Sequence, residues 1–67
     1  MLNKQLFKAK CALNDEKIKN LAEYININPQ TLRKKINENG EFKCSQIRSL
    51  SKRWDLTPNE IYEIFIK

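Results

Sequence analysis

Apolar residues recur along the chain three and four positions apart, with polar residues filling the positions between them. The clearest stripe has four members, Ile18, Leu21, Ala22 and Ile25. This spacing places apolar side chains on one face of an α-helix, where they can pack into a core. Repeats of the pattern predict five short helices, over about 2–12, 15–25, 29–37, 44–54 and 58–66.

The other predicted helices each contribute an apolar stripe of their own. On the first helix the predicted inward positions are Leu2, Leu6, Ala9 and Leu13. The stripes of the last three helices are Leu32 and Ile36, then Ile47, Leu50 and Trp54, and finally Ile61, Ile64 and Phe65. Trp54 and Phe42 are therefore expected in the core, rather than on the surface as stacking platforms for single-stranded nucleic acid. The five helices predict one all-α domain spanning 1–67.

Capping residues mark where the predicted helices begin. Three polar residues can each accept a hydrogen bond from the first unpaired backbone N–H groups of a helix, namely Asn14, Asn28 and Thr57. An apolar residue stands before each of them and can pack on the fourth helical residue, as Leu13 would on Ile18. The start after Lys43 keeps such an apolar pair but has no capping side chain.

Length and composition narrow the chemistry that the chain can perform. Its 67 residues allow one small core, and with one Gly and two Pro there are few sites for tight hairpins. There is no His, and no nucleophile–base pair, paired carboxylates or metal-binding cluster can be assembled. We therefore expect neither an enzyme nor a bound metal, cofactor or small-molecule ligand.

The sequence also carries no signal for a membrane or for export. No apolar stretch approaches the roughly 18 residues that a membrane span needs, and the N-terminal residues lack an apolar secretory core. We expect a cytoplasmic protein. In that compartment Cys11 and Cys44 are expected to be small buried apolar side chains or unreactive thiols, rather than a disulfide.

The second and third predicted helices are separated by only Asn26, Ile27 and Asn28. So short a connection suits two helices that meet at a steep angle, a helix-turn-helix over about 15–37. Such a crossing needs a small residue at the contact, which Ala22 supplies. It also needs a turn residue that tolerates a positive φ, which Asn26 supplies in place of Gly.

The residues from Leu21 to Leu32, LAEYININPQTL, resemble the helix-turn-helix of phage repressors and Cro proteins. INENGEF, at 36–42, is similar to the loop that follows the recognition helix in small prophage regulators of low-GC Gram-positive bacteria. LTPNEIYEIF, at 56–65, is similar to their final helix. The resemblance covers about residues 3–66 and departs from the family's pattern at Asn26, usually Gly, and at Lys43, usually Ser or Thr. It implies a lambda-repressor-like fold and a transcription regulator that inserts 29–37 into the major groove of DNA.

Side-chain chemistry on the third helix also favours DNA. With Leu32 and Ile36 turned inward, the polar residues of 29–37 must lie on the outer surface. Gln can pair with adenine and Arg or Lys with guanine, and Thr can contact a base or a phosphate. From this chemistry and the resemblance, the expected base-reading residues are Asn28, Gln30, Thr31, Arg33 and Lys34.

The positive charge of the chain is concentrated where DNA would bind. The formal net charge is +5, and residues 29–53 carry seven basic side chains against two acidic ones. Residues near the helix starts and after the third helix are suited to phosphate oxygens. The expected phosphate-contacting residues are Lys17, Lys19, Asn37, Asn39, Lys43 and Ser45. Arg48, Lys52 and Arg53 serve either DNA contact or solubility.

Two further expectations concern protein partners and the edge of the core. The last helix has more apolar surface than one small core needs and is a candidate dimer seam, with Glu60, Tyr62, Glu63, Phe65 and Ile66 as its surface residues. A homodimer would bind a double-stranded operator as two half-sites.

Lys35 is expected to pack its stem on the core edge with its ammonium in water. The alternative function is a protein-interaction module of the same fold, acting as an antirepressor or modulator of another regulator.

Overall fold

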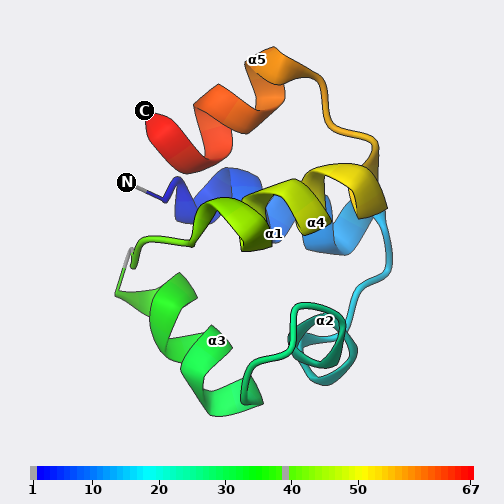
Figure 1. Cartoon of the computed structure of the whole chain (residues 1–67), viewed down its shortest axis with the longest axis vertical. Helices are drawn as coiled ribbons and strands as arrows, with labels where there is room; N and C mark the ends of the chain where they lie inside the picture. The colour runs from blue at the N-terminus through cyan, green and yellow to red at the C-terminus, as the bar shows by residue number, and fades with distance from the viewer. Residues whose placement is uncertain (1, 39) are drawn as a thin grey trace.

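The computed structural model describes residues 2–38 and 40–67, and these are helical with no strand among them. The helices are α1 (Lys4–Leu13), α2 (Ile18–Tyr24), α3 (Pro29–Asn37), α4 (Cys44–Trp54) and α5 (Pro58–Ile61), as Figure 1 shows. A π-helical turn, η1 (Tyr62–Ile66), continues α5 without a break. The predicted all-α class is confirmed, and α3 and α4 begin and end where the sequence predicts.

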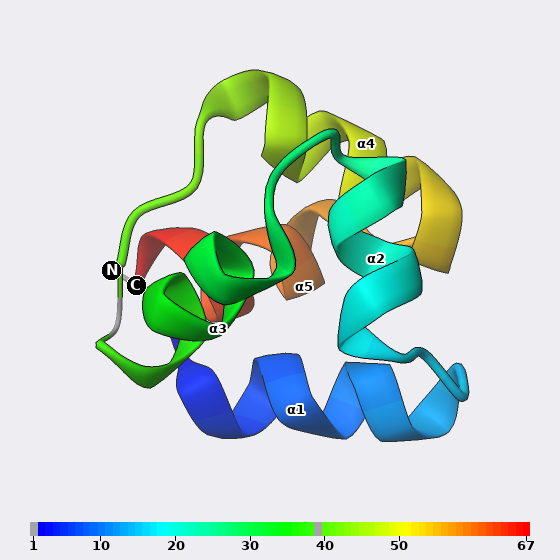
Figure 2. The same ribbon diagram turned by 90° about the horizontal axis from the view of Figure 1, so that it is seen from below.

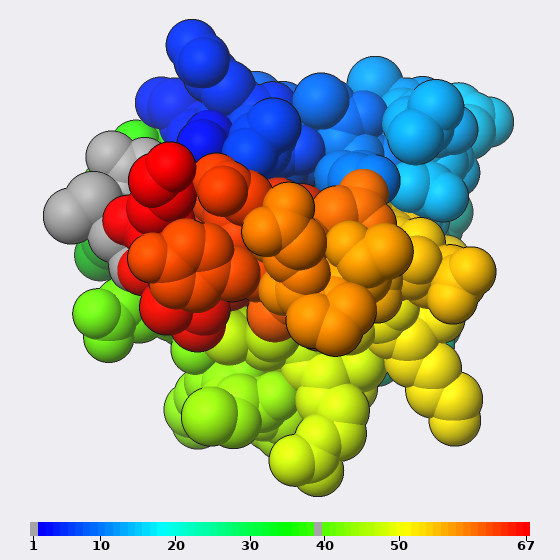
Figure 3. Space-filling view, turned by 90° about the horizontal axis from the view of Figure 1, so that it is seen from above, coloured from blue at the N-terminus to red at the C-terminus, as the bar shows by residue number. Residues whose placement is uncertain are grey.

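The helices form layers around α1 and α4. In Figure 1 these two helices cross the middle of the molecule, with α5 and η1 on one side and α2 and α3 on the other. Figure 3 shows the face of the molecule on which the C-terminal segment lies between α1 and α4. The two ends of the chain are joined directly, since the N–H of Asn3 donates to the carbonyl of Ile64 at 2.7 Å.

Aromatic rings form the centre of the core. Phe7 is fully buried, and its ring centroid lies 5.5 Å from that of Phe42, 5.4 Å from Trp54 and 6.2 Å from Phe65. The rings of Trp54 and Phe65 meet Phe7 edge to face, a favourable arrangement. The prediction that Trp54 and Phe42 belong to the core is confirmed, although Phe42 is only half-buried.

The predicted apolar stripe of α1 is wrong. Leu13 is 77% exposed and Leu6 39%, whereas Phe7 is fully buried and Cys11 half-buried. The helix begins at Lys4, because the side chain of Asn3 accepts a hydrogen bond from the N–H of Leu6 at 3.1 Å. Leu2 is buried but precedes the helix, and it does not set the helical phase. The phase follows Phe7, whose ring has more apolar surface to bury than a Leu side chain.

The predicted start of α2 after Asn14 is also wrong. Asn14 closes α1 instead: its backbone N–H and its side-chain amide both donate to the carbonyl of Lys10, at 3.0 and 2.8 Å. Asp15 then takes a left-handed backbone with φ of 53°, and α2 begins only at Ile18. An Asn can end a helix as well as begin one. The expected packing of Leu13 on Ile18 is absent, since Leu13 points into solvent.

The other caps match the prediction. Asn28 accepts from the N–H of Gln30 at 2.7 Å, and Thr57 and Glu60 form the reciprocal pair of a capping box. At α4 the side chain of Gln46 accepts from the N–H of Lys43 at 2.9 Å. Among the described residues, no helix is both long and apolar enough to cross a membrane.

Candidate functional site

The connection between α2 and α3 is a tight turn over 25–28. Asn26 has a φ of 61°, as expected for the residue that replaces Gly there. The N–H of Ile27 donates to the carbonyl of Ala22 at 2.9 Å, and Ala22 is fully buried. In Figure 1 the viewer looks almost along the axis of α2 while α3 runs across the view, so the two helices cross steeply. This is a helix-turn-helix arrangement.

The two faces of α3 differ sharply. Leu32 and Ile36 are buried in the core. The exposed residues of the helix are those predicted to face outward, Gln30, Thr31, Arg33, Lys34 and Asn37. Within the described part of the chain, the side chains of Gln30, Arg33 and Lys34 make no hydrogen bond or ion pair. Their donors and acceptors are therefore available to a partner.

Asn28 is also exposed, but part of its side chain is already occupied. Its carbonyl oxygen accepts the N–H of Gln30 and caps α3. Its amide NH₂ group, which makes no hydrogen bond to the described residues, remains for contact with a base. Sequence reasoning assigned both roles to Asn28, and the geometry leaves room for both.

The predicted phosphate-contacting residues lie on three helix ends. Lys17 and Lys19 are exposed at the start of α2, Asn37 at the end of α3, and Lys43 and Ser45 at the start of α4. In Figure 2 the first turns of α2 and α4 lie on different sides of α3. Asn39, the sixth predicted residue, lies outside the described residues.

A close loop follows α3 and adds partners for Lys35 to those expected. Its Nζ, in an exposed hydrogen bond, donates to the carbonyl of Glu41 at 2.9 Å and lies 5.6 Å from the ring centre of Phe42. The N–H of Gly40 donates to the carbonyl of Lys35 at 2.7 Å. A Cβ at Gly40 would stand 3.0 Å from the Cα of Lys35, so an alanine there would force this backbone contact to open slightly. Sequence reasoning noticed this glycine but not its close contact with Lys35.

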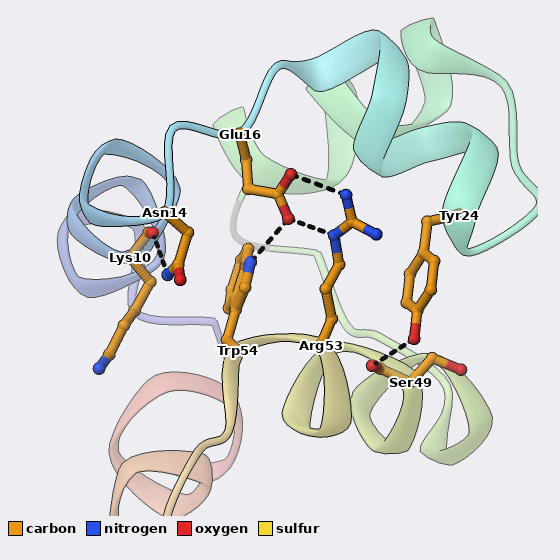
Figure 4. Close-up of polar contacts among 7 residues, drawn as sticks. All are labelled: Lys10, Asn14, Glu16, Tyr24, Ser49, Arg53 and Trp54. Carbon is orange, nitrogen blue, oxygen red and sulfur yellow. Dashed lines mark hydrogen bonds and ion pairs between the residues drawn. The ribbon is translucent and has the colours of Figure 1, made fainter.

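A polar cluster between the start of α2 and the end of α4 was not predicted. Glu16 accepts hydrogen bonds from the indole of Trp54 at 2.8 Å and from Nε and Nη2 of Arg53, the latter at 3.0 Å (Figure 4). The guanidinium lies 4.5 Å from the ring centre of Tyr24, whose hydroxyl donates to the carbonyl of Ser49 at 3.3 Å. The hydrogen bond from Arg53 is the main reason that the pKa of Glu16 is lowered. The cluster fixes the start of α2 against the end of α4.

One signal in the sequence could have revealed this cluster. A Trp in the core needs an acceptor for its indole N–H, and an unassigned Glu was present in the loop before α2. Arg53, interpreted as a choice between DNA contact and solubility, is instead paired within the protein. Arg48 and Lys52 remain exposed.

The two cysteines are not bonded to each other and differ in their surroundings. Cys11 is half-buried, and burial, helped by the charge of Glu16, raises the pKa of its thiol to about 11. Cys44 is exposed at the start of α4, so the expectation of a buried side chain is wrong for it. It is the first residue of α4, where the backbone N–H groups have no hydrogen-bond partner within the helix.

Comparison with known proteins gave no match to this chain among family models, curated proteins or solved structures.

Proposed function

We propose that this protein is a small sequence-specific transcription regulator of the phage repressor and Cro type, which inserts α3 into the major groove of double-stranded DNA. The observation that carries the proposal is the outer face of α3, where Gln30, Arg33 and Lys34 are exposed and their side chains make no hydrogen bond or ion pair with the described residues. The steep crossing between α2 and α3 holds α3 on the surface of the core. Such a regulator acts in the cytoplasm of a bacterial host, where the operator DNA lies.

The side chains of α3 match the chemistry of base edges. Gln30 can pair with adenine, and Arg33 and Lys34 can donate to the acceptors of guanine. Thr31 reaches either a base or a phosphate, and the amide NH₂ of Asn28 reaches an acceptor beside the helix start. Pro29 offers no donor, so its contact with DNA is limited to apolar contact with a thymine methyl group.

Phosphate contacts would come from both sides of α3. Lys17 and Lys19 provide cations at α2, and Lys43 provides one at α4. The side chain of Lys43 has no acceptor and cannot cap the N–H groups of the first turn of α4. These N–H groups are suited to a phosphate oxygen, together with the hydroxyl of Ser45. Asn37, with Asn39 after it, completes the proposed set.

A homodimer would read two half-sites one helical turn apart, about 34–36 Å. The C-terminal segment lies on the far side of α1 and α4 from α3, so pairing through it leaves the outer face of α3 uncovered (Figure 1). Tyr62 and Ile66, 50% and 56% exposed, provide apolar surface there. Phe65 does not contribute to the seam, because it is buried in the core.

Fluorescence anisotropy with the duplex upstream of the protein's own coding sequence tests the proposal. Three lysine contacts per protomer, Lys17, Lys19 and Lys43, make six per dimer and predict a salt slope of about −5. Affinity should then fall about 10³-fold between about 50 and 200 mM salt. Specific binding with this slope supports the proposal. Binding that is absent at low salt contradicts it and leaves the protein-interaction module as the better hypothesis.

A further inference from the structure

A cavity lies beside the proposed DNA-reading helix, between α1, α3 and the start of α2. Its volume is about 350 Å³, and its lining comprises Phe7, Lys8, Cys11, Glu16, Ile18, Arg33, Ile36 and Asn37. Figure 2 shows α2 and α3 on the same side of α1, around this region. This volume is at the lower end of the size range of small-molecule sites.

The interior of the cavity is mainly apolar. Its accessible apolar surface comes from the half-buried Ile18 and Cys11, which lie over the buried Phe7 and Ile36. Glu16 adds a carboxylate, which already accepts hydrogen bonds from Arg53 and Trp54. The thiol of Cys11, with a pKa that burial raises to about 11, carries no charge at neutral pH. A ligand body in contact with this interior should therefore be apolar and compact.

The rim of the cavity is cationic. Lys8 of α1 and Arg33 of α3 are exposed and line the same cavity, and neither pairs with another described residue. Asn37 adds a neutral amide beside them. An Arg and a carboxylate form two parallel hydrogen bonds, and a nearby Lys adds attraction. An apolar interior with two unpaired cations at its mouth is complementary to a small anion that has an apolar body.

We propose that this cavity binds a small aromatic or branched monocarboxylate, with its apolar body against Ile18 and Cys11 and its carboxylate between Lys8 and Arg33. The ligand would then control DNA binding, an effect that rests on the function proposed above. Arg33 cannot hold a carboxylate and a base edge or phosphate at the same time. Bound ligand and bound DNA are therefore in competition, and each weakens the binding of the other.

Three probe molecules separate the contributions that the apolar body and the negative charge of the ligand make to binding. Phenylacetate carries both, 2-phenylethanol keeps the body without the charge, and acetate keeps the charge without the body. NMR titration of the protein without DNA should show saturable shifts of Ile18, Cys11 and the Asn37 amide with phenylacetate, at a dissociation constant in the millimolar range. The other two probes should bind at least about fivefold more weakly.

Two pairs of variants locate the site. Cys11→Met fills the cavity and should abolish these shifts, whereas Ala12→Met adds the same side chain at an exposed position of α1 and should leave them. Lys8→Gln should weaken phenylacetate about fivefold, whereas Lys4→Gln, one turn earlier and outside the cavity, should not. Equal binding of 2-phenylethanol overturns the role of the cations. Absence of saturable shifts, or persistence of them in Cys11→Met, overturns the site.

Competition with DNA is measured separately. Saturating phenylacetate should weaken duplex binding about tenfold, the scale of one lost arginine contact, and Lys8→Gln should reduce this effect. Unchanged duplex affinity in saturating phenylacetate overturns the competition. If the protein binds no duplex at all, the proposed function fails, while the titration of the free protein still decides whether the cavity is a binding site.

Discussion

Replacing Glu16 with Ala removes the acceptor that holds the start of α2 against the end of α4. The carboxylate is only 8% exposed and serves two donors, the indole of Trp54 at 2.8 Å and the guanidinium of Arg53 (Figure 4). Trp54 is 7% exposed, so in the variant its N–H would have little access to water. The variant therefore loses an ion pair and leaves a largely buried donor without a partner.

The two losses differ in size. A buried donor left unsatisfied costs about 1–3 kcal/mol. The ion pair contributes less, about 0.2–1 kcal/mol, because the side chain of Arg53 is 33% exposed and is screened by solvent. Together they predict that Glu16→Ala lowers the free energy of unfolding by about 2 kcal/mol. For a domain of this size that corresponds to a fall in Tm of about 10 °C.

Chemical and thermal unfolding, followed by circular dichroism, measure this change. Glu23→Ala, at an exposed position of α2, is the matched control and should change stability by less than about 0.5 kcal/mol. In a Trp54→Phe background the donor is already gone, so Glu16→Ala should cost only the ion pair, less than about 1 kcal/mol. Equal costs of Glu16→Ala in the two backgrounds would refute the role of the indole. A cost as small as that of the control would refute the cluster altogether.

The same carboxylate predicts a dependence on pH. The hydrogen bond from Arg53 holds the pKa of Glu16 below its ordinary value in the folded protein. A group of this kind contributes stability that is fully present above its unfolded pKa, about 4.3, and is lost as the pH falls through the folded value. The stability difference between the wild type and Glu16→Gln should be constant above about pH 5 and shrink below about pH 4. A difference that persists in strong acid would show that the charge of Glu16 is not responsible.

Three further changes test the caps, the loop after α3 and the cysteines. Gly40→Ala should cost about 1 kcal/mol in chemical unfolding, because its Cβ would crowd the backbone of Lys35 at 3.0 Å; an unchanged midpoint argues against that close contact. Thr57→Ala should cost about 1 kcal/mol, and Thr57→Ser should restore most of it, since the hydroxyl caps α5. Iodoacetamide at about pH 8, followed by peptide mass spectrometry, should modify Cys44 at least about tenfold faster than Cys11, whose thiol is half-buried and has a pKa of about 11; equal rates would contradict this.

Local signals predicted the elements that lie around α3. Asn28 and Thr57 act as caps, and Asn26 takes the positive φ that the short turn demands. Each of these features depends on a few neighbouring residues, so spacing and residue type are enough to find it. The outward face of α3 follows from the inward positions of Leu32 and Ile36 in the same way.

Features that depend on distant residues could not be found in this way. The phase of α1 is set by Phe7, whose partners come from three other parts of the chain. Glu16 pairs with Arg53 and Trp54, more than thirty residues away, and α2 therefore begins later than predicted. Asn14 can either begin or end a helix. Its hydrogen bonds to the carbonyl of Lys10, in the last turn of α1, show that it ends one.

Selection of binding sites from a randomised duplex library tests the central claim, that α3 reads DNA, most directly. The wild type should enrich one motif with half-sites about one helical turn apart. Lys34→Ala should change the preferred bases, Lys43→Ala should keep the motif and weaken binding to all sequences, and Lys52→Ala is the control on the exposed surface of α4. The same motif and base preferences from Lys34→Ala and the wild type, or no enriched motif at all, would contradict the claim.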